Sequence, residues 1–294
     1  MVDSGRYESW QPSTYAPFPR RTINRAAQRI RTAEEGIGRW VIFTVQTLYY
    51  LPLTVRRYRK QTLRTMNSMA WGRGSIIIDG GVISLLFVLG VAIGVAIAIE
   101  AYNTLNLIGF GALSGVIGAF FNIREMAPIM LGVGFAAQVG CRMTAEIGSM
   151  RISEEIDATE ALGIRSIAYV VGTRVVGGLI CVIPGYLLSL AIAFGTAALF
   201  VTTLNDAPSG TYYHYFSQFL DPIDIALSLV KAIVFCVVIT IVHCYYGYFA
   251  SGGPEGVGRA SGRAIRVSLV AVVVLNLAMT IVLWGLRPTI VFKG

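Results

Sequence analysis

Charged residues are scarce in this chain of 294 residues. Asp, Glu, Lys and Arg make up only 14% of the sequence, whereas 55% of the residues are hydrophobic and the mean hydropathy is +0.65. Soluble domains carry about 25% charged residues, so this scarcity argues against a soluble protein. Several apolar runs exceed the roughly 18 residues that indicate a membrane helix. The composition therefore predicts an all-α polytopic membrane protein.

Histidine and cysteine are too few and too widely spaced to indicate a metal or disulfide framework. The chain has two histidines and no Cys-x-x-Cys pair, and its four cysteines lie in apolar stretches, at Cys141, Cys181, Cys236 and Cys244. Such cysteines are typical of small core residues. A Gly-x-x-x-x-Gly-Lys-Ser/Thr loop for nucleotide phosphates is also absent. The sequence therefore predicts no enzyme activity and no bound cofactor, and any ATP would be hydrolysed by another chain.

Positive charge is concentrated before the first long apolar run. Residues 1–73 hold 13 Lys or Arg and four Asp or Glu, whereas the rest of the chain holds 11 and 12. This pattern favours a cytoplasmic anchor over a nucleic-acid-binding tail. Within this region, 37–51 is apolar but too short to span a bilayer, and 56–60 is strongly basic. We expect a basic N-terminal region with a helix at the membrane interface; a helix packed on protein is the alternative.

The remaining residues, 74–294, are expected to form a transmembrane domain of about five helices. The apolar stretches that predict them are 75–99, 103–148, 167–201, 223–250 and 264–284. The sequence leaves open whether 103–123 is a separate helix, a re-entrant segment or part of one broken helix, and Pro128 favours a break. The run 167–201 is too short for two crossings and predicts one long helix. Between the spans, 202–222 and 251–263 are expected to be loops.

Loop charges predict the orientation of these spans. Residues 1–73, 149–165 and 251–266 carry Lys or Arg, whereas 100–107 and 202–222 carry none. By the positive-inside rule the first three face the cytoplasm. We therefore expect a multi-pass protein of the inner membrane with a cytoplasmic N-terminus.

The densest group of charges lies within 149–165. Ser153 is a suitable N-cap and Gly163 a suitable left-handed stop, which predicts a short helix over 154–162. Four acids lie on it, with three apolar residues as a contact set: Glu154, Glu155, Asp157 and Glu160, and Ile152, Ile156 and Leu162. So short a helix is marginal in water alone. Two alternatives stay open: it fits a basic groove on a soluble partner, or it is a solvated loop with capping acids.

Two motifs resemble a known family. The stretch 146–164, EIGSMRISEEIDATEALGI, is similar to the signature of MlaE/YrbE permeases, and REMAP at 124–128 is similar to that family's Arg-Glu-x-x-Pro element. The resemblance covers roughly 75–285, including the spacing of the spans. More narrowly, the Arg-rich N-terminal region resembles that of a YrbE subunit, of B type, in an actinobacterial Mce (mammalian cell entry) transporter.

This resemblance implies a permease subunit of an ABC-type lipid transporter. Its partners would be a second YrbE-type permease, two ATPase subunits that bind ATP and Mg²⁺, and a ring of MCE-domain proteins. The substrate would be an imported membrane lipid, such as a fatty acid, mycolic acid or sterol. The segment 153–163 would be the coupling helix to the ATPase, through Ser153, Glu154, Glu155, Ile156, Asp157, Glu160, Leu162 and Gly163. At Glu155 many relatives have Gln, so this chain carries extra charge there.

Charges inside the spans need partners, because an unpaired charge in a bilayer is costly. Arg142 and Glu146 are four residues apart and are predicted to pair on one helix face. Asp79, Arg174 and Lys231 stand alone in the sequence. Structural ion pairs are the simpler interpretation of these residues, and contacts to a lipid headgroup are the alternative.

The adjacent Arg124 and Glu125 point in different directions and must find different partners. Because they belong to the motif shared with the family, these two residues and Pro128 are candidates for the substrate pathway or for gating.

Three weaker patterns complete the prediction. His243 with Tyr245 and Tyr246 favours an aromatic belt at the membrane boundary over a proton relay. The Gly90-x-x-x-Gly94 spacing favours close helix packing within the chain over a dimer face. Two other functions stay open, an ion-coupled secondary carrier and a membrane scaffold for an outer lipid-transfer complex. A carrier needs inverted repeats and midplane acids, of which the sequence shows little.

Overall fold

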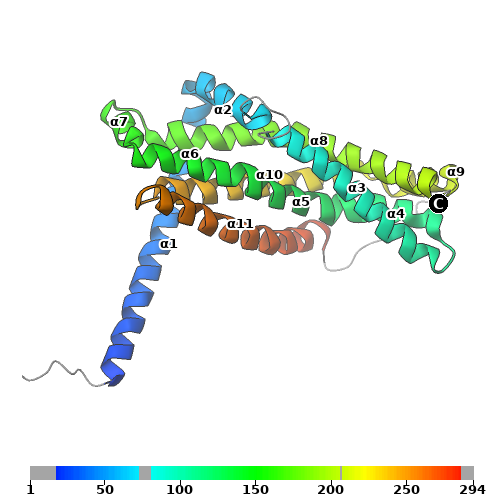
Figure 1. Ribbon diagram of the computed structural model, residues 1–294, viewed down its shortest axis with the longest axis horizontal. Helices are drawn as coiled ribbons and strands as arrows, with labels where there is room; N and C mark the ends of the chain where they lie inside the picture. The colour runs from blue at the N-terminus through cyan, green and yellow to red at the C-terminus, as the bar shows by residue number, and fades with distance from the viewer. Residues whose placement is uncertain (1–17, 73–80, 206, 286–294) are drawn as a thin grey trace, which may run out of the picture. The chain divides into compact units, whose positions relative to one another are not determined.

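The computed structural model describes residues 18–72, 81–205 and 207–285, and almost all of them are helical (Figure 1). The α-helices are α1 (Phe18–Arg57), α2 (Arg59–Trp71), α3 (Val82–Asn106), α4 (Ser114–Phe121), α5 (Ala127–Gly134), α6 (Cys141–Ile152), α7 (Glu155–Ala161), α8 (Thr173–Leu199), α9 (Ser209–Phe219), α10 (Pro222–Tyr248) and α11 (Gly253–Trp284). Shorter 3₁₀ or π-helical stretches are η1 (Gly111–Leu113), η2 (Asn122–Met126), η3 (Phe135–Gly140), η4 (Ile167–Gly172) and η5 (Phe200–Leu204).

Five helical segments are long and apolar enough to cross a membrane: Val82–Asn106, Ser114–Ile152, Ile167–Leu204, Pro222–Tyr248 and Gly253–Trp284. This confirms the predicted all-α fold with five spans. The start of the first predicted span, including Asp79, lies outside the described residues.

The chain divides into two compact units, 1–45 and 46–294, and the boundary between them falls within the residues of α1. In the described part of the first unit the chain is helical from Phe18 onward. The helix that the sequence predicted over 37–51 is present but longer, because α1 runs unbroken from Phe18 to Arg57 with Pro52 inside it. Its place at the membrane interface stays a prediction. The Arg, Ala and Gln residues before position 37 are strong helix formers, and they extend the helix toward its N-terminus.

The second span shows how the segment around 103–123 continues, which the sequence left open. Helical structure is continuous from Ser114 to Ile152, so the predicted break at Pro128 was wrong. The π-helical turn η2 directly precedes α5, and Pro128 occupies the first turn of α5. A π turn shifts the backbone pairing by one residue, and a proline at that position lacks an amide that would otherwise need an acceptor. The helix therefore accommodates Pro128 through a local π-helical turn.

Two expected loops are largely helical. Residues 202–222 contain η5 and α9, and 251–263 form the first turns of α11. At the start of α11, Gly252 has a φ of 90° and Pro254 lies in the first helical turn with Glu255. A left-handed glycine followed by proline and an acid marks the start of a helix. The many glycines of 251–263 had instead favoured the prediction of a loop. The run 167–201, in contrast, is one long helical span with Pro184 inside, as predicted.

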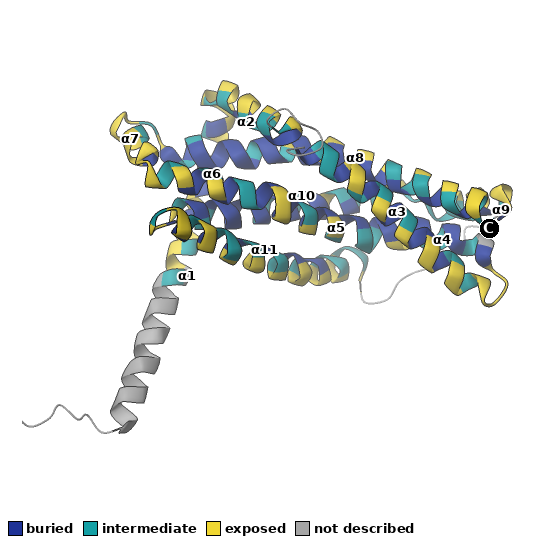
Figure 2. Cartoon of the chain, in the orientation of Figure 1, coloured by how far each residue is buried: buried dark blue, intermediate teal, exposed yellow. Residues whose placement is uncertain are grey.

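Close packing of α3 on α8 forms part of the core of the second unit (Figure 2). A Cβ atom on Gly94 would lie 2.4 Å from the carbonyl oxygen of Ala193, and one on Gly90 would lie 2.7 Å from that of Ser189. Ile93 and Ile97 pack beside these glycines against Ala193. The glycines thus permit helix contact within the chain, as predicted, because a side chain at either position would separate α3 from α8.

Candidate functional sites

The short helix α7 lies at one end of the bundle formed by residues 46–294, and α9 lies at the other end (Figure 1). Its start differs from the prediction. Ser153 ends α6, because its amide donates to the carbonyl of Ser149 (3.0 Å), and its hydroxyl donates to the same carbonyl (3.0 Å). Glu154 then adopts a left-handed φ of 58° and α7 begins at Glu155. The predicted N-cap at Ser153 was therefore wrong, since the amide of Ser153 is already hydrogen-bonded in the last turn of α6.

Gly163 ends this region with a φ of 73°, as the sequence predicted. Of the three apolar residues expected to pack, Ile156 is fully buried and fixes α7 to the bundle. Ile152 and Leu162 are exposed, with 78% of Leu162 accessible to solvent. Ile156 thus packs within the chain, and contact of Ile152 and Leu162 with a partner stays a prediction. An exposed leucine at the end of a short helix is free to enter a pocket on a partner.

The four acids of this region have different surroundings. Asp157 forms an ion pair with Arg151 (2.6 Å), and Glu160 accepts hydrogen bonds from the hydroxyls of Ser166 and Tyr248. Glu155 accepts a hydrogen bond from Ser153 (3.0 Å) beside the exposed Glu154. Asp157 and Glu160 therefore hold α7 in place, whereas Glu154 and Glu155 form the outward acidic surface.

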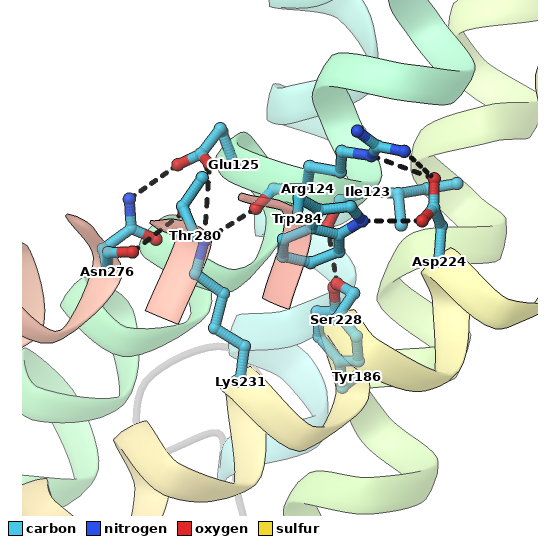
Figure 3. Close-up of polar contacts among 10 residues, drawn as sticks. All are labelled: Ile123, Arg124, Glu125, Tyr186, Asp224, Ser228, Lys231, Asn276, Thr280 and Trp284. Atoms are coloured by element: carbon cyan, nitrogen blue, oxygen red, sulfur yellow. Dashed lines mark hydrogen bonds and ion pairs between the residues drawn. The ribbon is translucent and has the colours of Figure 1, made fainter. Parts of the chain in front are cut away.

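A second cluster of charges lies inside the spans, where η2 meets α10 and α11 (Figure 3). Arg124 donates two hydrogen bonds to one oxygen of Asp224 (2.9 and 2.8 Å), and the indole of Trp284 donates to the other oxygen (2.7 Å). The guanidinium of Arg124 also lies 3.9 Å from the ring centre of Phe120. These contacts neutralise Arg124 and join the second, fourth and fifth spans.

Glu125 points away from Asp224, toward Lys231 of α10 and toward Asn276 and Thr280 of α11 (Figure 3). Its carboxylate accepts hydrogen bonds from Asn276 (2.6 Å) and Thr280 (2.6 Å) and lies 3.5 Å from the ammonium of Lys231. The fully buried Lys231 also donates to the carbonyl of Arg124 (2.8 Å) and to Thr280 (2.8 Å). The structural ion pair favoured for Lys231 is thus present, and the prediction of different partners for Arg124 and Glu125 is confirmed.

We call Arg124, Glu125, Asp224 and Lys231 the four-charge cluster. It holds two positive and two negative side chains, so its formal charge is balanced within the chain. Sequence reasoning did not assign Asp224, whose position in the first turn of a span resembles an ordinary helix-start acid. Pro128 is buried one turn beyond Arg124.

The Arg142–Glu146 pair is present, with 3.0 Å between Nε and Oε1. Arg142 also donates to the hydroxyl of Ser68 (3.1 Å). Arg174, which the sequence left alone, lies 3.4 Å from the other carboxylate oxygen of Glu146 and donates to the carbonyl of Val170 (2.8 Å). A cavity of about 780 Å³ opens beside this group, lined by residues of α2, η3, α6 and α8.

His243 is fully buried, so its predicted place in an aromatic boundary belt was wrong. Its ring nitrogens contact the hydroxyls of Thr144 (2.8 Å) and Ser268 (3.2 Å), which joins α6, α10 and α11. No group of three His, Cys, Asp or Glu residues is placed to hold a metal ion within 18–72, 81–205 and 207–285.

Known proteins resemble this chain across the region that holds both sites. A family model described as "Permease MlaE" matches residues 75–282. A probable ABC transporter permease protein of Rickettsia bellii is 32% identical over 187 residues, which cover 64% of this chain and 72% of the relative. A similarly named protein of Synechocystis is 30% identical, with coverages of 74% and 80%. The intermembrane phospholipid transport system permease protein MlaE of Haemophilus influenzae is 27% identical, with coverages of 70% and 80%.

Proposed function

Because the chain belongs to the MlaE permease family, we propose that it is the membrane-spanning subunit of an ABC-type lipid transporter. The family match carries this proposal, since it extends over the first four spans, nearly all of the fifth, the four-charge cluster and α7. A transporter subunit of this kind moves its substrate without catalysing a reaction, and a separate ATPase supplies the energy. The family and the five apolar helices indicate a multi-pass protein of the inner membrane.

The narrower assignment is a YrbE subunit, of B type, in an actinobacterial Mce system. It rests on the Arg-rich region 1–73 and on the motif at 146–164. In such a system a ring of MCE-domain proteins would exchange lipid with the permease outside the membrane. The imported lipid would be a fatty acid, a mycolic acid or a sterol, and ATP and Mg²⁺ would bind the partner ATPase.

The coupling role is assigned to 153–163, on the cytoplasmic face. Its exposed surface combines Glu154 and Glu155 with the protruding Leu162, which suits an apolar pocket with a basic rim on an ATPase. Such a surface is unsuited to an anionic lipid leaflet, which would repel the carboxylates. These features support the partner over the solvated-loop alternative.

A second permease subunit is supported by the exposure of α11. Only 17% of its most apolar 18-residue stretch is buried, compared with 39–50% for the corresponding stretches of the other four spans. Val270, Val273 and Leu277 are exposed along it. The surface left open is continuous and apolar, as is expected for a helix that contacts another permease and lipid.

Reconstitution of the chain with its partner permease and ATPase in lipid vesicles tests the proposed function. We expect ATP-dependent movement of lipid and a change in ATP hydrolysis when the transported lipid is present. Transport without ATP would support an ion-coupled carrier, and lipid-independent hydrolysis without transport would support a scaffold. Either result would overturn the proposal.

A further inference from the structure

The carboxylate of Glu160 joins the end of α7 to two other helical segments. It accepts hydrogen bonds from the hydroxyl of Ser166, just before η4, and from the hydroxyl of Tyr248, the last residue of α10 (3.1 Å). The two hydroxyls lie 2.9 Å from each other. One carboxylate thus closes a three-residue contact between α7, α10 and the start of the third span.

This contact complements the other connections of α7. At its N-terminal end α7 follows α6 directly, and the Arg151–Asp157 ion pair reinforces that junction. Buried Ile156 packs α7 onto the bundle. The hydrogen bond from Tyr248 to Glu160 links α7 directly to α10.

α10 carries both Asp224 and Lys231 of the four-charge cluster. At a rise of 1.5 Å per residue, Lys231 lies about 26 Å along this helix from Tyr248. α10 is α-helical from Pro222 to Tyr248 without an internal proline. A displacement at Tyr248 would therefore be carried along α10 to the four-charge cluster, because the helix would shift as one rigid element.

The surroundings leave room for such a displacement. A cavity of about 490 Å³ lies beside the contact, lined by Tyr50, Glu160, Arg165 and Ser166 among others. Glu160 and Leu162 are themselves exposed. The end of α7 is thus bordered by open space, and a hydrogen bond of 3.1 Å joins it to α10.

We propose that Tyr248 is a positioning residue that passes the movement of α7 to α10 through its hydrogen bond to Glu160. The proposal rests on the proposed function, because it assigns a route within a permease driven at α7. ATP hydrolysis at the partner would displace α7, and the Glu160–Tyr248 contact would make α10 and its charged residues follow.

Tyr248→Phe removes only the hydroxyl and tests this route. In the reconstituted complex we expect ATPase co-purification and basal hydrolysis to stay within about twofold, while lipid moved per ATP falls about fivefold, which corresponds to one hydrogen bond. Tyr246→Phe is the matched control, since it removes a hydroxyl from the same helix end and keeps the ring near Arg263. Glu160→Gln combined with Tyr248→Phe should be no worse than the more impaired of the two single variants.

An unchanged ratio of lipid moved to ATP hydrolysed in Tyr248→Phe would overturn the proposal. Loss of ATPase binding in this variant would also overturn it, since the residue would then serve assembly. If the unmodified complex shows no ATP-dependent transport, the proposed function fails instead, and this outcome is distinct from both.

Discussion

Combining Leu162→Asp with Glu154→Lys is expected to release the ATPase subunit while the membrane subunit stays folded. Both side chains are exposed, and neither contributes to the contacts that hold α7, which come from Ile156, Asp157 and Glu160. Burial of a protruding apolar residue in a partner pocket is often worth about 2–4 kcal/mol. Replacement of Leu162 by a charged residue, with reversal of the charge at Glu154, should weaken binding by about 30-fold or more.

Co-purification of the ATPase with a tagged permease measures this release. Leu107→Asp serves as the control, because this leucine is 87% exposed in the turn that follows α3. The thermal unfolding midpoints of both variants should match that of the unmodified protein. Retention of the ATPase and of transport in the double variant would show that the ATPase binds elsewhere. Glu160 is left intact, because its removal would confuse docking with the integrity of α7.

Lys231→Met is expected to destabilise the protein and abolish transport. The lysine side chain is fully buried and supplies hydrogen bonds to Thr280 and to the carbonyl of Arg124, beside the carboxylate of Glu125. Removal of one partner from a buried ion pair costs about 3–5 kcal/mol, because the other charge is left uncompensated. We expect a lower unfolding midpoint in detergent and a loss of lipid transport of more than about tenfold.

The double variant Glu125→Gln with Lys231→Met distinguishes charge balance from packing. It removes one charge of each sign, so it should recover much of the stability lost in Lys231→Met alone. Lys60→Met, at an exposed position on α2, should have little effect. If the double variant is as unstable as the single one, packing of the lysine stem determines stability. If it regains stability without transport, the pair has a role in transport itself.

Local spacing was sufficient for some of these features. The four-residue interval of Arg142 and Glu146 predicted their ion pair, and apolar length predicted all five spans. Gly163 was recognised as a helix stop because a left-handed residue there favours glycine. Each of these properties depends on neighbours within a few turns of helix.

Other features depend on helices that meet in space. Asp224 is 100 residues from Arg124, and Thr280 is 155 residues from Glu125. No local pattern shows which faces of the second, fourth and fifth spans are in contact, so these partners could not be assigned from sequence. The same limit applies to Glu160. In the sequence it is one of four similar acids, and its contact with Tyr248 arises only when distant helices meet in the fold.

The side of the membrane on which α7 lies is the most direct test of the account. Leu162→Cys, in a chain whose half-buried Cys141 is replaced by Ser, adds an exposed thiol, while Cys181, Cys236 and Cys244 remain buried. We expect a membrane-impermeant maleimide to label it in inside-out vesicles that lack the ATPase, and bound ATPase to protect it. Labelling in right-side-out vesicles instead would place α7 outside the cytoplasm and contradict its role as the contact for the ATPase.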